Sequence, residues 1–577
     1  MSADPLPGPL QGRAASPGAA LGPAFVIAPR LEIKEPISAD DPDRERERVD
    51  TALTQVADDL EVLADEVAES AGEEEAGIFM AHAEFAADPE LADRVHASIA
   101  DGASAERAVR EGFGGFRSLL EQSSSEYLAA RAADLDDVRD QVLDVLAGRA
   151  VEKAPTEPCV VVAVELTPSQ TARIPREFLL AIACERGSPT SHSAILARSL
   201  KIPAVVGVDG LMGRLEAGQL LAVDGEAGEI IVEPDATTQN EIRQRGQAHT
   251  ERAEELRLAA AEPCVTADGR RIEVAANIDG PDALDRAVDH GAEGTGLVRT
   301  ELLFLESNEP PSIEEQTEYY QRVLATFPGE RVVVRTMDIG ADKPLPFVDR
   351  EEEDNPALGL RGLRLGLAQP ELLRDQLRAL LRAAATAADD SGQLAIMFPL
   401  VSRVDEVPRA RELLDEAAAA EEIDTAVLER IEIGVMIEVP SAALAARRIA
   451  AQLDFVSIGT NDLLQYLFAV DRVNADVAAI PDLLDPDVLR LLRDVADAAH
   501  AEGAWIGVCG EAAADPLTAA ALVGAGADEL SATPAAIPEV KAMLRGTSAA
   551  ALVDAVNEAI GLPDADAVRD RIRSLLV

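Results

Sequence analysis

Lysine, aromatic residues and cysteine are all scarce in this sequence. Only five of the 52 basic residues are Lys, and aromatic residues make up 3% of the chain. The four cysteines (Cys159, Cys184, Cys264 and Cys509) are far apart and form neither a CxxC pair nor a zinc-binding spacing. This pattern excludes a disulfide-rich secreted module and is typical of reduced thiols in a cytoplasm.

Long apolar runs and a targeting segment are also missing. No stretch of about 18 or more uncharged apolar residues occurs, so we expect no membrane-spanning helix. Residues Met1 to Pro9 contain neither a basic region nor an apolar core, which predicts that no signal peptide is present. We therefore expect a cytoplasmic protein.

Acidic residues exceed basic ones twofold. The chain has 105 Asp and Glu against 52 Lys and Arg, a formal net charge of -53, spread over its whole length. The apolar content of 47% is too high for a disordered acidic chain. This charge argues against nucleic acid and anionic membranes as partners. A folded chain this acidic and this poor in Lys resembles proteins of salt-in halophiles, in which high ionic strength screens self-repulsion.

Residues 40–147 have the pattern of helices. Apolar residues recur at spacings of three and four along Val49–Val67, and Gly72, Gly102 and Gly148 separate or end the helical stretches. The pattern predicts a bundle of helical hairpins with short loops.

Residues 158–234 change to short strands. The predicted strands are Val160–Val162, Leu179–Ile182, Ala204–Val206, Leu220–Val223 and Glu229–Val232. The last two flank a turn and predict a β-hairpin. Residues 10–30 have a similar character, so we expect them to complete the same sheet and the helical bundle to be an insertion in an α/β domain.

From Pro263 to the end, strand-like runs alternate with helical patterns, after a polar stretch at 238–261 that predicts a connecting helix. The runs are Ile272–Ile278, Gly296–Thr300, Val332–Met337, Leu394–Pro399, Ile433–Val439, Phe455–Gly459, Trp505–Val508 and Glu529–Ala532. Eight β/α units favour a TIM barrel, and a doubly wound open sheet is the alternative.

One histidine stands at the predicted start of a helix. His192 follows Thr190 and Ser191, and apolar residues follow at helical spacing. A helix N-terminus offers free N–H donors and a positive dipole end, which stabilise a phosphoryl group on such a histidine. The alternative is a capping Ser or Thr beside a histidine of purely structural role.

Charged and polar residues cluster where five of the eight predicted barrel strands finish, at the end where catalytic groups of a TIM barrel collect. They are Arg299-Thr300-Glu301, Arg335-Thr336-Met337-Asp338, Glu438, Gly459-Thr460-Asn461-Asp462 and Cys509-Gly510-Glu511. Converging arginines suit a phosphate or carboxylate. Glu438 and Asp462 suit a hard cation such as Mg²⁺, and Cys509 suits a proton donor or a nucleophile. The alternatives are surface ion pairs for the arginines and a small buried apolar residue for Cys509.

Together these segments resemble Enzyme I, the phosphoenolpyruvate–protein phosphotransferase family of the sugar phosphotransferase system. The matching segments are Ala15–Gly18, Leu166–Ser169, Thr190–His192, Gly296–Glu301, Arg335–Gly340, Asn355–Arg361, Gly434–Glu438, Ser457–Asp462, Ala469–Arg472 and Val508–Glu511. Their order and spacing cover nearly the whole chain. Two positions depart from the family pattern: Ser188 replaces a glycine before the histidine segment, and another glycine is replaced within Ala512–Ala514.

The resemblance implies a role for each site residue. His192 would carry the phosphoryl group on Nε2, and Thr167 would steady its ring. Cys509 would protonate enolpyruvate, and Glu438 and Asp462 would bind Mg²⁺. The groups implied to hold phosphoenolpyruvate are Arg299, Arg335, Arg472, Asn461 and Asp462 around the phosphate and Arg361 at the carboxylate.

The resemblance also implies a domain plan. A swivelling phosphohistidine α/β domain would comprise residues 1–35 and 148–237, with a helical domain that binds the phosphocarrier HPr inserted at 36–147. A helical linker at 238–262 would lead to a phosphoenolpyruvate-binding TIM barrel at 263–577, through which a homodimer forms.

Two other functions fit parts of the sequence. A relative of pyruvate phosphate dikinase or phosphoenolpyruvate synthase would need an ATP-binding domain, and no Gly-rich phosphate loop precedes residue 150. A non-catalytic phosphoenolpyruvate sensor would be expected to have lost His192 or one of the carboxylates, and all are present.

Overall fold

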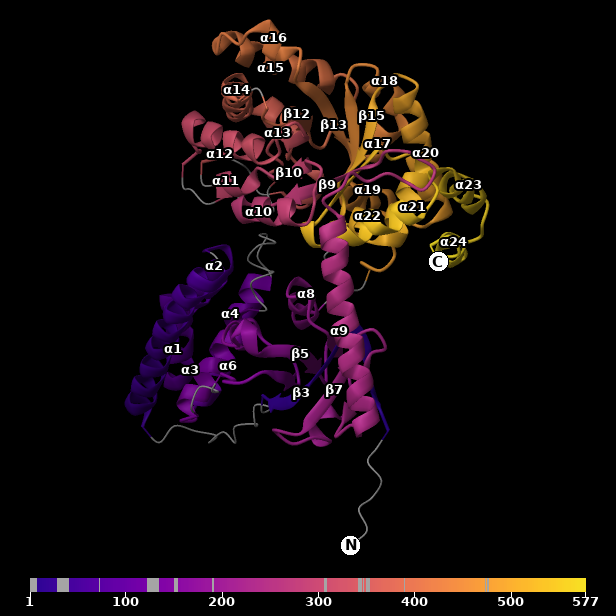
Figure 1. The fold of residues 1–577 in the computed structure, drawn as a ribbon. Coiled ribbons are helices and arrows are strands. Elements are labelled where there is room, and N and C mark those ends of the chain that lie inside the picture. The colour runs from indigo at the N-terminus through magenta and orange to yellow at the C-terminus, as the bar shows by residue number, and fades with distance from the viewer. Residues whose placement is uncertain are drawn as a thin grey trace. The chain divides into compact units, whose positions relative to one another are not determined.

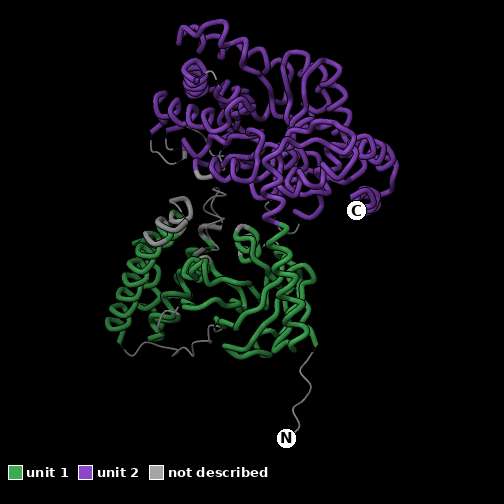
Figure 2. The backbone as a smooth tube through the Cα atoms, viewed as in Figure 1, with its two compact units in different colours: residues 1–252 green, residues 253–577 purple. Residues whose placement is uncertain are grey.

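The computed structural model describes residues 8–27, 41–71, 73–121, 134–149, 154–188, 191–305, 309–340, 345, 347–348, 353–388, 390–472, 474 and 477–576. They belong to two compact units, residues 1–252 and 253–577 (Figure 2).

The first unit contains the predicted helical bundle. Its described helices are α1 (Pro42–Ala71), α2 (Glu73–Ala86), α3 (Pro89–Ala100), α4 (Ala105–Glu121) and α6 (Asp134–Leu146). The predicted apolar stripe of α1 is buried, and it comprises Val49, Leu53, Val56, Leu60, Leu63 and Val67. These side chains form one apolar core with residues of the other four helices, such as Val95 and Phe113. Removing a stripe of this length from water is the main source of the bundle's stability.

An eight-stranded sheet forms the rest of this unit. Its strands are β1 (Leu10–Gln11), β2 (Arg13–Ser16), β3 (Ala19–Val26), β4 (Cys159–Ala163), β5 (Leu179–Cys184), β6 (Ala204–Val206), β7 (Leu220–Asp224) and β8 (Glu229–Val232). They lie in the order β1-β8-β7-β3-β4-β5-β6-β2. Strands β3 to β6 run parallel, and the other pairings are antiparallel. The hairpin and the contribution of the N-terminal segment are confirmed, and the bundle is inserted between β3 and β4.

Both faces of this sheet are apolar because alternate strand residues form two separate clusters. One cluster packs against Ala194 and Ala197 of α8 (His192–Ser199). The unit also contains α7 (Pro168–Ala172) and two 3-10 turns, Arg176–Phe178 and Leu211–Gly213. The connecting helix predicted at 238–261 is α9 (Ala236–Ala259).

The second unit is a closed barrel of eight parallel strands (Figure 1). They are β9 (Glu273–Ile278), β10 (Thr295–Val298), β11 (Arg331–Arg335), β12 (Gln393–Phe398), β13 (Glu432–Ile437), β14 (Phe455–Ile458), β15 (Trp505–Val508) and β16 (Glu529–Ala532). Strand β16 pairs with β9 and closes the ring. The TIM barrel is therefore confirmed, and the doubly wound open sheet is excluded.

Helices surround the barrel. They are α10 (Pro281–Asp289), α11 (Glu301–Leu305), α12 (Ile313–Thr326), α13 (Leu363–Ala368), α14 (Pro370–Thr386), α15 (Glu406–Ala420), α16 (Thr425–Leu428), α17 (Pro440–Leu444), α18 (Ala446–Ala450), α19 (Thr460–Phe468), α20 (Pro486–His500), α21 (Pro516–Ala525), α22 (Ile537–Gly546), α23 (Ala549–Ala559) and α24 (Ala565–Arg573). Outward strand residues such as Val456 and Ile458 pack against them in the largest apolar core. Among the helices that the structure describes, none has the length and apolar character needed to cross a bilayer.

The inside of the barrel is polar at the amino-terminal ends of its strands. Arg331 lies 2.8 Å from Glu273 and 3.0 Å from Glu432, and its guanidinium is 4.0 Å from the centre of the Trp505 ring. These residues begin alternate strands, so their side chains meet inside the barrel. Glu529, at the start of β16, is 1% exposed. Burial, together with the nearby Glu273 carboxylate, raises the pKa of Glu529 to about 8.

Glu529→Gln is expected to stabilise the chain at alkaline pH and to leave it unchanged near pH 4. Because the pKa of Glu529 is raised on folding, the unfolded chain loses this proton first, and stability falls as pH rises from the ordinary range to about 8. The amide of the variant does not ionise, so this loss of stability at high pH does not occur in it. At pH 9 we expect a gain of a few kcal/mol, since one pKa unit corresponds to about 1.4 kcal/mol. Urea unfolding at both pH values measures it, and equal stability of the two proteins at pH 9 would contradict it.

Candidate active site

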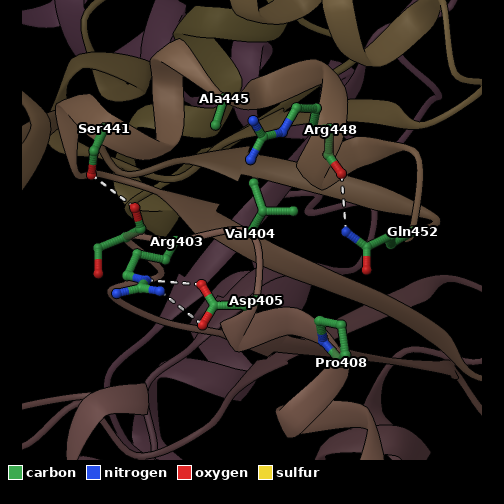
Figure 3. Close-up of a pocket in the computed structure, with 9 residues that line it drawn as sticks. Arg403, Val404, Asp405, Pro408, Ser441, Ala445, Arg448 and Gln452 are labelled. Carbon is green, nitrogen blue, oxygen red and sulfur yellow. Dashed lines mark hydrogen bonds and ion pairs between the residues drawn. The ribbon is translucent and has the colours of Figure 1, made fainter.

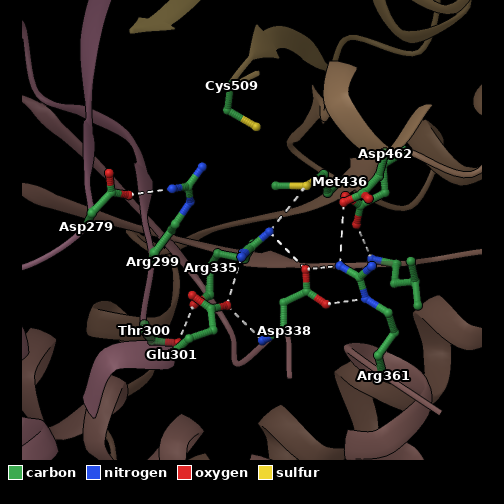
Figure 4. Close-up of polar contacts among 12 residues, drawn as sticks. Asp279, Arg299, Thr300, Glu301, Arg335, Asp338, Arg361, Met436, Asp462 and Cys509 are labelled. Atoms are coloured by element: carbon green, nitrogen blue, oxygen red, sulfur yellow. Dashed lines mark hydrogen bonds and ion pairs between the residues drawn. The ribbon is translucent and has the colours of Figure 1, made fainter. Parts of the chain in front are cut away.

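Several of the polar residues predicted at the ends of the barrel strands lie close together, among them Arg299, Arg335, Asp338, Asp462 and Cys509 (Figure 4). Arg335 ends β11, and Asp338 follows three residues later. Glu438 and Cys509 directly follow β13 and β15, and Asp462 is in the first turn of α19. Parallel strands in a closed barrel carry these positions to the same end, so residues distant in sequence become neighbours.

Three buried carboxylates form the centre of this site. One oxygen each of Asp338, Glu438 and Asp462 lies within 4.8 Å of the others. Burial raises the pKa of Glu438 to about 8, with Asp338 and Asp462 adding to the shift. Among the residues that the structure describes, the buried Asp462 Oδ1 has no hydrogen-bond partner, and it lies 3.5 Å from Arg472 in an ion pair. Converging carboxylate oxygens of this kind fit a hard divalent cation, which would relieve their mutual repulsion.

Two buried arginines border the carboxylates. Arg335 lies 2.8 Å from Glu301 and 3.0 Å from Asp338, and Arg361 lies 2.8 Å from Asp338 and 3.5 Å from Asp462. Burial alone would lower the pKa of each guanidinium, but the adjacent carboxylates outweigh it and raise both pKa values. Both arginines therefore stay cationic, as a site for a phosphate or carboxylate requires.

The other predicted polar groups are more exposed. Arg299 pairs with Asp279 at 2.8 Å, and its side chain is 40% exposed. Asn461 donates from Nδ2 to Glu511 at 3.3 Å, and the Arg472 side chain is 47% exposed. Arg299 points toward the space between Arg335 and Cys509 (Figure 4). These groups lie at the rim, where they are open to an incoming anion.

Cys509 is 4% exposed, and its Sγ lies 3.8 Å from the Ile458 carbonyl oxygen, to which it donates. Burial raises the pKa of the thiol to about 11, while the Ser457 hydroxyl acts in the opposite direction. The thiol is therefore protonated near neutral pH. This protonation state suits a proton donor better than a thiolate nucleophile.

His192 and Thr167 belong to the first unit. His192 is the first residue of α8, directly after the N-cap Ser191. Its side chain, and Thr190 before it, lie outside the described residues. Thr167 caps α7 and accepts a hydrogen bond from the Gln170 N–H at 3.3 Å. The described contacts of Thr167 are thus those of a helix cap.

Neither departure from the family pattern strains the backbone. Gly187 has φ of 106°, and the neighbouring Ser188 is not among the residues with positive φ. The alanines that follow Glu511 form a 3-10 turn, Glu511–Ala514, without positive φ. A side chain is therefore accommodated at each position.

Some site residues were not identified as such from the sequence. The sequence predicts Asp338 only as a polar residue at a strand end, and the structure adds its carboxylate to the cluster of Glu438 and Asp462. Glu301 accepts a hydrogen bond from the Asp338 N–H at 2.9 Å and also binds Arg335. Gln376 of α14 accepts from the Met337 N–H at 2.9 Å. The position of Asp338 beside Arg335 was an available signal, whereas nothing in the sequence links Gln376 to this loop.

A separate cavity of about 550 Å³ lies between the loop and helix that follow β12 and the two short helices that follow β13 (Figure 3). It is lined by Ser402, Arg403, Val404, Asp405, Pro408, Ser441, Ala445, Arg448 and Gln452. Arg403 is held by Asp405 at 2.8 Å. None of the predicted site residues lines this cavity.

Comparison with known proteins agrees with this architecture. Three family models match: "PEP-utilising enzyme, N-terminal" at residues 11–131, "mobile domain" at 155–228 and "PEP-binding domain" at 253–549. The phosphoenolpyruvate-protein phosphotransferase of Latilactobacillus sakei is 40% identical over 559 residues, covering 96% of each chain. The protein of that name from Bacillus subtilis is 40% identical over 527 residues, covering 90% of this chain and 91% of the other. This chain therefore belongs to the phosphoenolpyruvate-protein phosphotransferase family.

Proposed function

We propose that this chain transfers the phosphoryl group of phosphoenolpyruvate to His192 and then to a histidine of HPr, and that it releases pyruvate. The observation that best supports this is the buried cluster of Asp338, Glu438 and Asp462 between two cationic arginines at the barrel mouth. Such a site suits a small, highly charged anion bound together with a cation. Labelling of the chain by phosphoenolpyruvate without ATP tests the proposal.

The arginines bind and orient the substrate. Arg335, Arg299 and Arg472, with Asn461, hold the phosphate, and Arg361 holds the carboxylate. The positive charge of the arginines stabilises the negative charge on the transferring phosphoryl group. This electrostatic stabilisation is the main catalytic contribution in phosphoryl transfer. The ion pair with Glu301 orients the Arg335 guanidinium before the substrate binds.

Asp338, Glu438 and Asp462 would hold Mg²⁺. When bound, the ion would neutralise negative charge on the substrate oxygens. Oxygen ligands are what Mg²⁺ prefers, and Glu438 is further fixed by a 2.6 Å hydrogen bond from the Leu400 N–H.

Two bonds change at phosphorus and one at carbon. His192 Nε2 forms a bond to phosphorus as the bridging P–O bond breaks, which leaves the enolate of pyruvate. The Cys509 thiol gives its proton to the terminal carbon, and pyruvate leaves. The phosphoryl group then passes from His192 to HPr, and residues 235–262 provide the swivel that lets His192 serve both sites.

The alternatives explain less of the chain. A dikinase or synthase would require ATP, and a sensor would not be phosphorylated. Relatives that match this chain over 90% or more of both lengths carry the phosphotransferase name. We further propose a cytoplasmic location and a homodimer formed through the barrel.

Arg335→Ala should raise KM and lower kcat together. Its guanidinium is buried against two carboxylates, so it is placed to contact the phosphate both before and during transfer. Loss of a charge-assisted contact costs about 1.5–3 kcal/mol, or roughly ten- to hundredfold in kcat/KM. Steady-state kinetics measures this. Arg403→Ala, outside the site, is the control, and wild-type kinetics of Arg335→Ala would refute the role.

The helical domain should dock HPr through an apolar surface. Val62 of α1 and Met80 of α2 are 58% and 44% exposed. We expect Val62→Asp with Met80→Asp to weaken transfer to HPr about tenfold or more and to leave phosphorylation of His192 intact. Val288→Asp, at a residue 49% exposed on α10, is the matched control.

The salt dependence of HPr affinity distinguishes an apolar docking surface from an electrostatic one. With a net charge of -53, stability and activity should rise with KCl, because the Debye length falls from about 10 Å at 0.1 M to about 3 Å at 1 M. An apolar dock should keep its HPr affinity at molar KCl. Affinity that collapses at molar KCl would show that ion pairs hold HPr.

A further inference from the structure

The inside of the barrel contains an unusual set of buried polar groups beneath Cys509. Glu529 and Ser457 are each 1% exposed. Among the described residues, neither carboxylate oxygen of Glu529 has a hydrogen-bond partner, and the Ser457 Oγ has none at normal geometry. Leaving such groups buried and unpaired is costly, so their presence calls for a bridging water or a role.

Two glycines make room for these groups. A Cβ on Gly296 of β10 would lie 2.0 Å from Glu529 Oε1 and 2.5 Å from Ser531 Cβ, so the glycine leaves the space that this carboxyl group occupies. A Cβ on Gly507 of β15 would lie 3.2 Å from Ser457 Oγ and 3.5 Å from Glu529 Oε1. The serine hydroxyl and the carboxyl group therefore approach the same glycine from different strands, inside the barrel.

The groups lie in strand register between the two mouths of the barrel. Glu273, next to Glu529 in the strand register, contacts Arg331 at the opposite mouth, where its side chain is 20% exposed. Ser457 pairs in register with Gly507 of β15, two residues before Cys509, so the Ser457 and Cys509 side chains lie on the same face of the sheet. Ser531 and Asn277 form the adjoining wall, where Ser531 Oγ donates to Asn277 Oδ1 at 2.7 Å and Asn277 Nδ2 donates to the Cys509 carbonyl oxygen at 3.5 Å.

We infer that Glu273, Glu529 and Ser457 form a proton path along the barrel axis that reprotonates Cys509 from the mouth opposite the substrate. The inference rests on the proposed role of Cys509. After the thiol has protonated the enolate, the thiolate takes the Ser457 hydroxyl proton in the same concerted step in which a bridging water gives Ser457 another. That water takes a proton from the Glu529 carboxyl group, so no serine alkoxide forms. Glu529 regains its proton from Glu273, which takes one from solvent.

The acidic groups at the two ends of the path differ in proton affinity. Burial is the largest cause at each group, and it raises the pKa of Glu273 to about 7, that of Glu529 to about 8 and that of the Cys509 thiol to about 11. The Cys509 thiolate therefore has a higher proton affinity than either carboxylate, which favours net transfer of a proton from the carboxyl groups to the thiolate. Charged groups face each member of the path. Glu529 faces Arg331, Glu432 and Asp528, and Glu273 faces Glu293, Arg271 and Glu330. Cys509 faces Arg335 and Glu438.

The path predicts that the first turnover differs from later ones. In Glu529→Gln and in Ser457→Ala, Cys509 starts protonated, so the first pyruvate should form within about twofold of the wild-type rate. Later turnovers with excess HPr should be about tenfold slower or more, with an increased solvent deuterium effect, because the thiolate awaits a proton. Rapid-quench measurement of pyruvate in the full-length chain with Mg²⁺ separates the two phases.

Glu432→Gln is the control, since it removes a carboxylate from the same mouth but off the path. Thermal unfolding verifies that each variant is folded. Later turnovers at the wild-type rate in both path variants would overturn the inference and indicate reprotonation from the substrate side. Equal slowing of first and later turnovers would also overturn it, because that result marks a structural role. Absence of pyruvate formation by the wild-type chain would instead refute the proposed function.

Discussion

His192→Ala is expected to abolish phosphorylation of the chain by phosphoenolpyruvate and all transfer to HPr. The variant lacks the only group that the mechanism assigns as phosphoryl acceptor. Binding of phosphoenolpyruvate should remain within about twofold of wild type, because the arginines and carboxylates that we propose as its binding site belong to the barrel unit. Labelling with radioactive phosphoenolpyruvate and calorimetric titration measure the two quantities separately.

His96→Ala is the matched control for this substitution. His96 lies on α3 and pairs with Asp50 at 2.7 Å, far in sequence from any predicted site residue. Its loss should leave labelling intact. Stable labelling of His192→Ala would mean that another residue accepts the phosphoryl group and that the assignment of His192 is wrong.

Glu438→Gln is expected to lower phosphoryl transfer at least about a hundredfold and to raise the Mg²⁺ concentration needed for activity. The substitution removes one of three carboxylates whose oxygens lie within 4.8 Å of one another. Without cation, however, the amide should not destabilise the fold. Because burial raises the pKa of Glu438, ionising it costs folding free energy as pH rises toward about 8, and an amide avoids that cost.

Glu432 offers a control on the same strand. It begins β13, whereas Glu438 follows the other end of β13. Glu432→Gln should keep the wild-type Mg²⁺ dependence. The decisive measurement is activity against free Mg²⁺ alongside thermal unfolding in chelator. Full activity of the wild-type chain in excess chelator would remove the cation from the mechanism.

Much of the fold is predictable because it depends on local patterns. The strands predicted at Trp505–Val508 and Glu529–Ala532 agree with the structure residue for residue, and the other barrel strands agree within a few residues. Strands whose side chains alternate between the two faces of a sheet, and which are separated by amphipathic helices, are compatible with few other folds. The same order places Arg335, Glu438 and Cys509 at strand ends, so their gathering at one mouth follows from the barrel.

Contacts across the barrel are not predictable in this way. Glu529 looks like an ordinary first residue of a strand, and only closure of the sheet sets it against Gly296 and beneath Cys509. Gln376 likewise reaches the β11 loop from a helix 39 residues further along the chain. Such pairs carry no short-range signal, because their spacing is set by the ring and not by any helix or strand period.

The most direct test of the account is incubation of the full-length chain with labelled phosphoenolpyruvate and Mg²⁺ in molar KCl, without any nucleotide. We expect one phosphoryl group per chain, labile in acid and stable in alkali, located by mass spectrometry on the peptide that contains His192 and lost to HPr when HPr is added. Labelling that requires ATP, or a label on a residue other than His192, would contradict it.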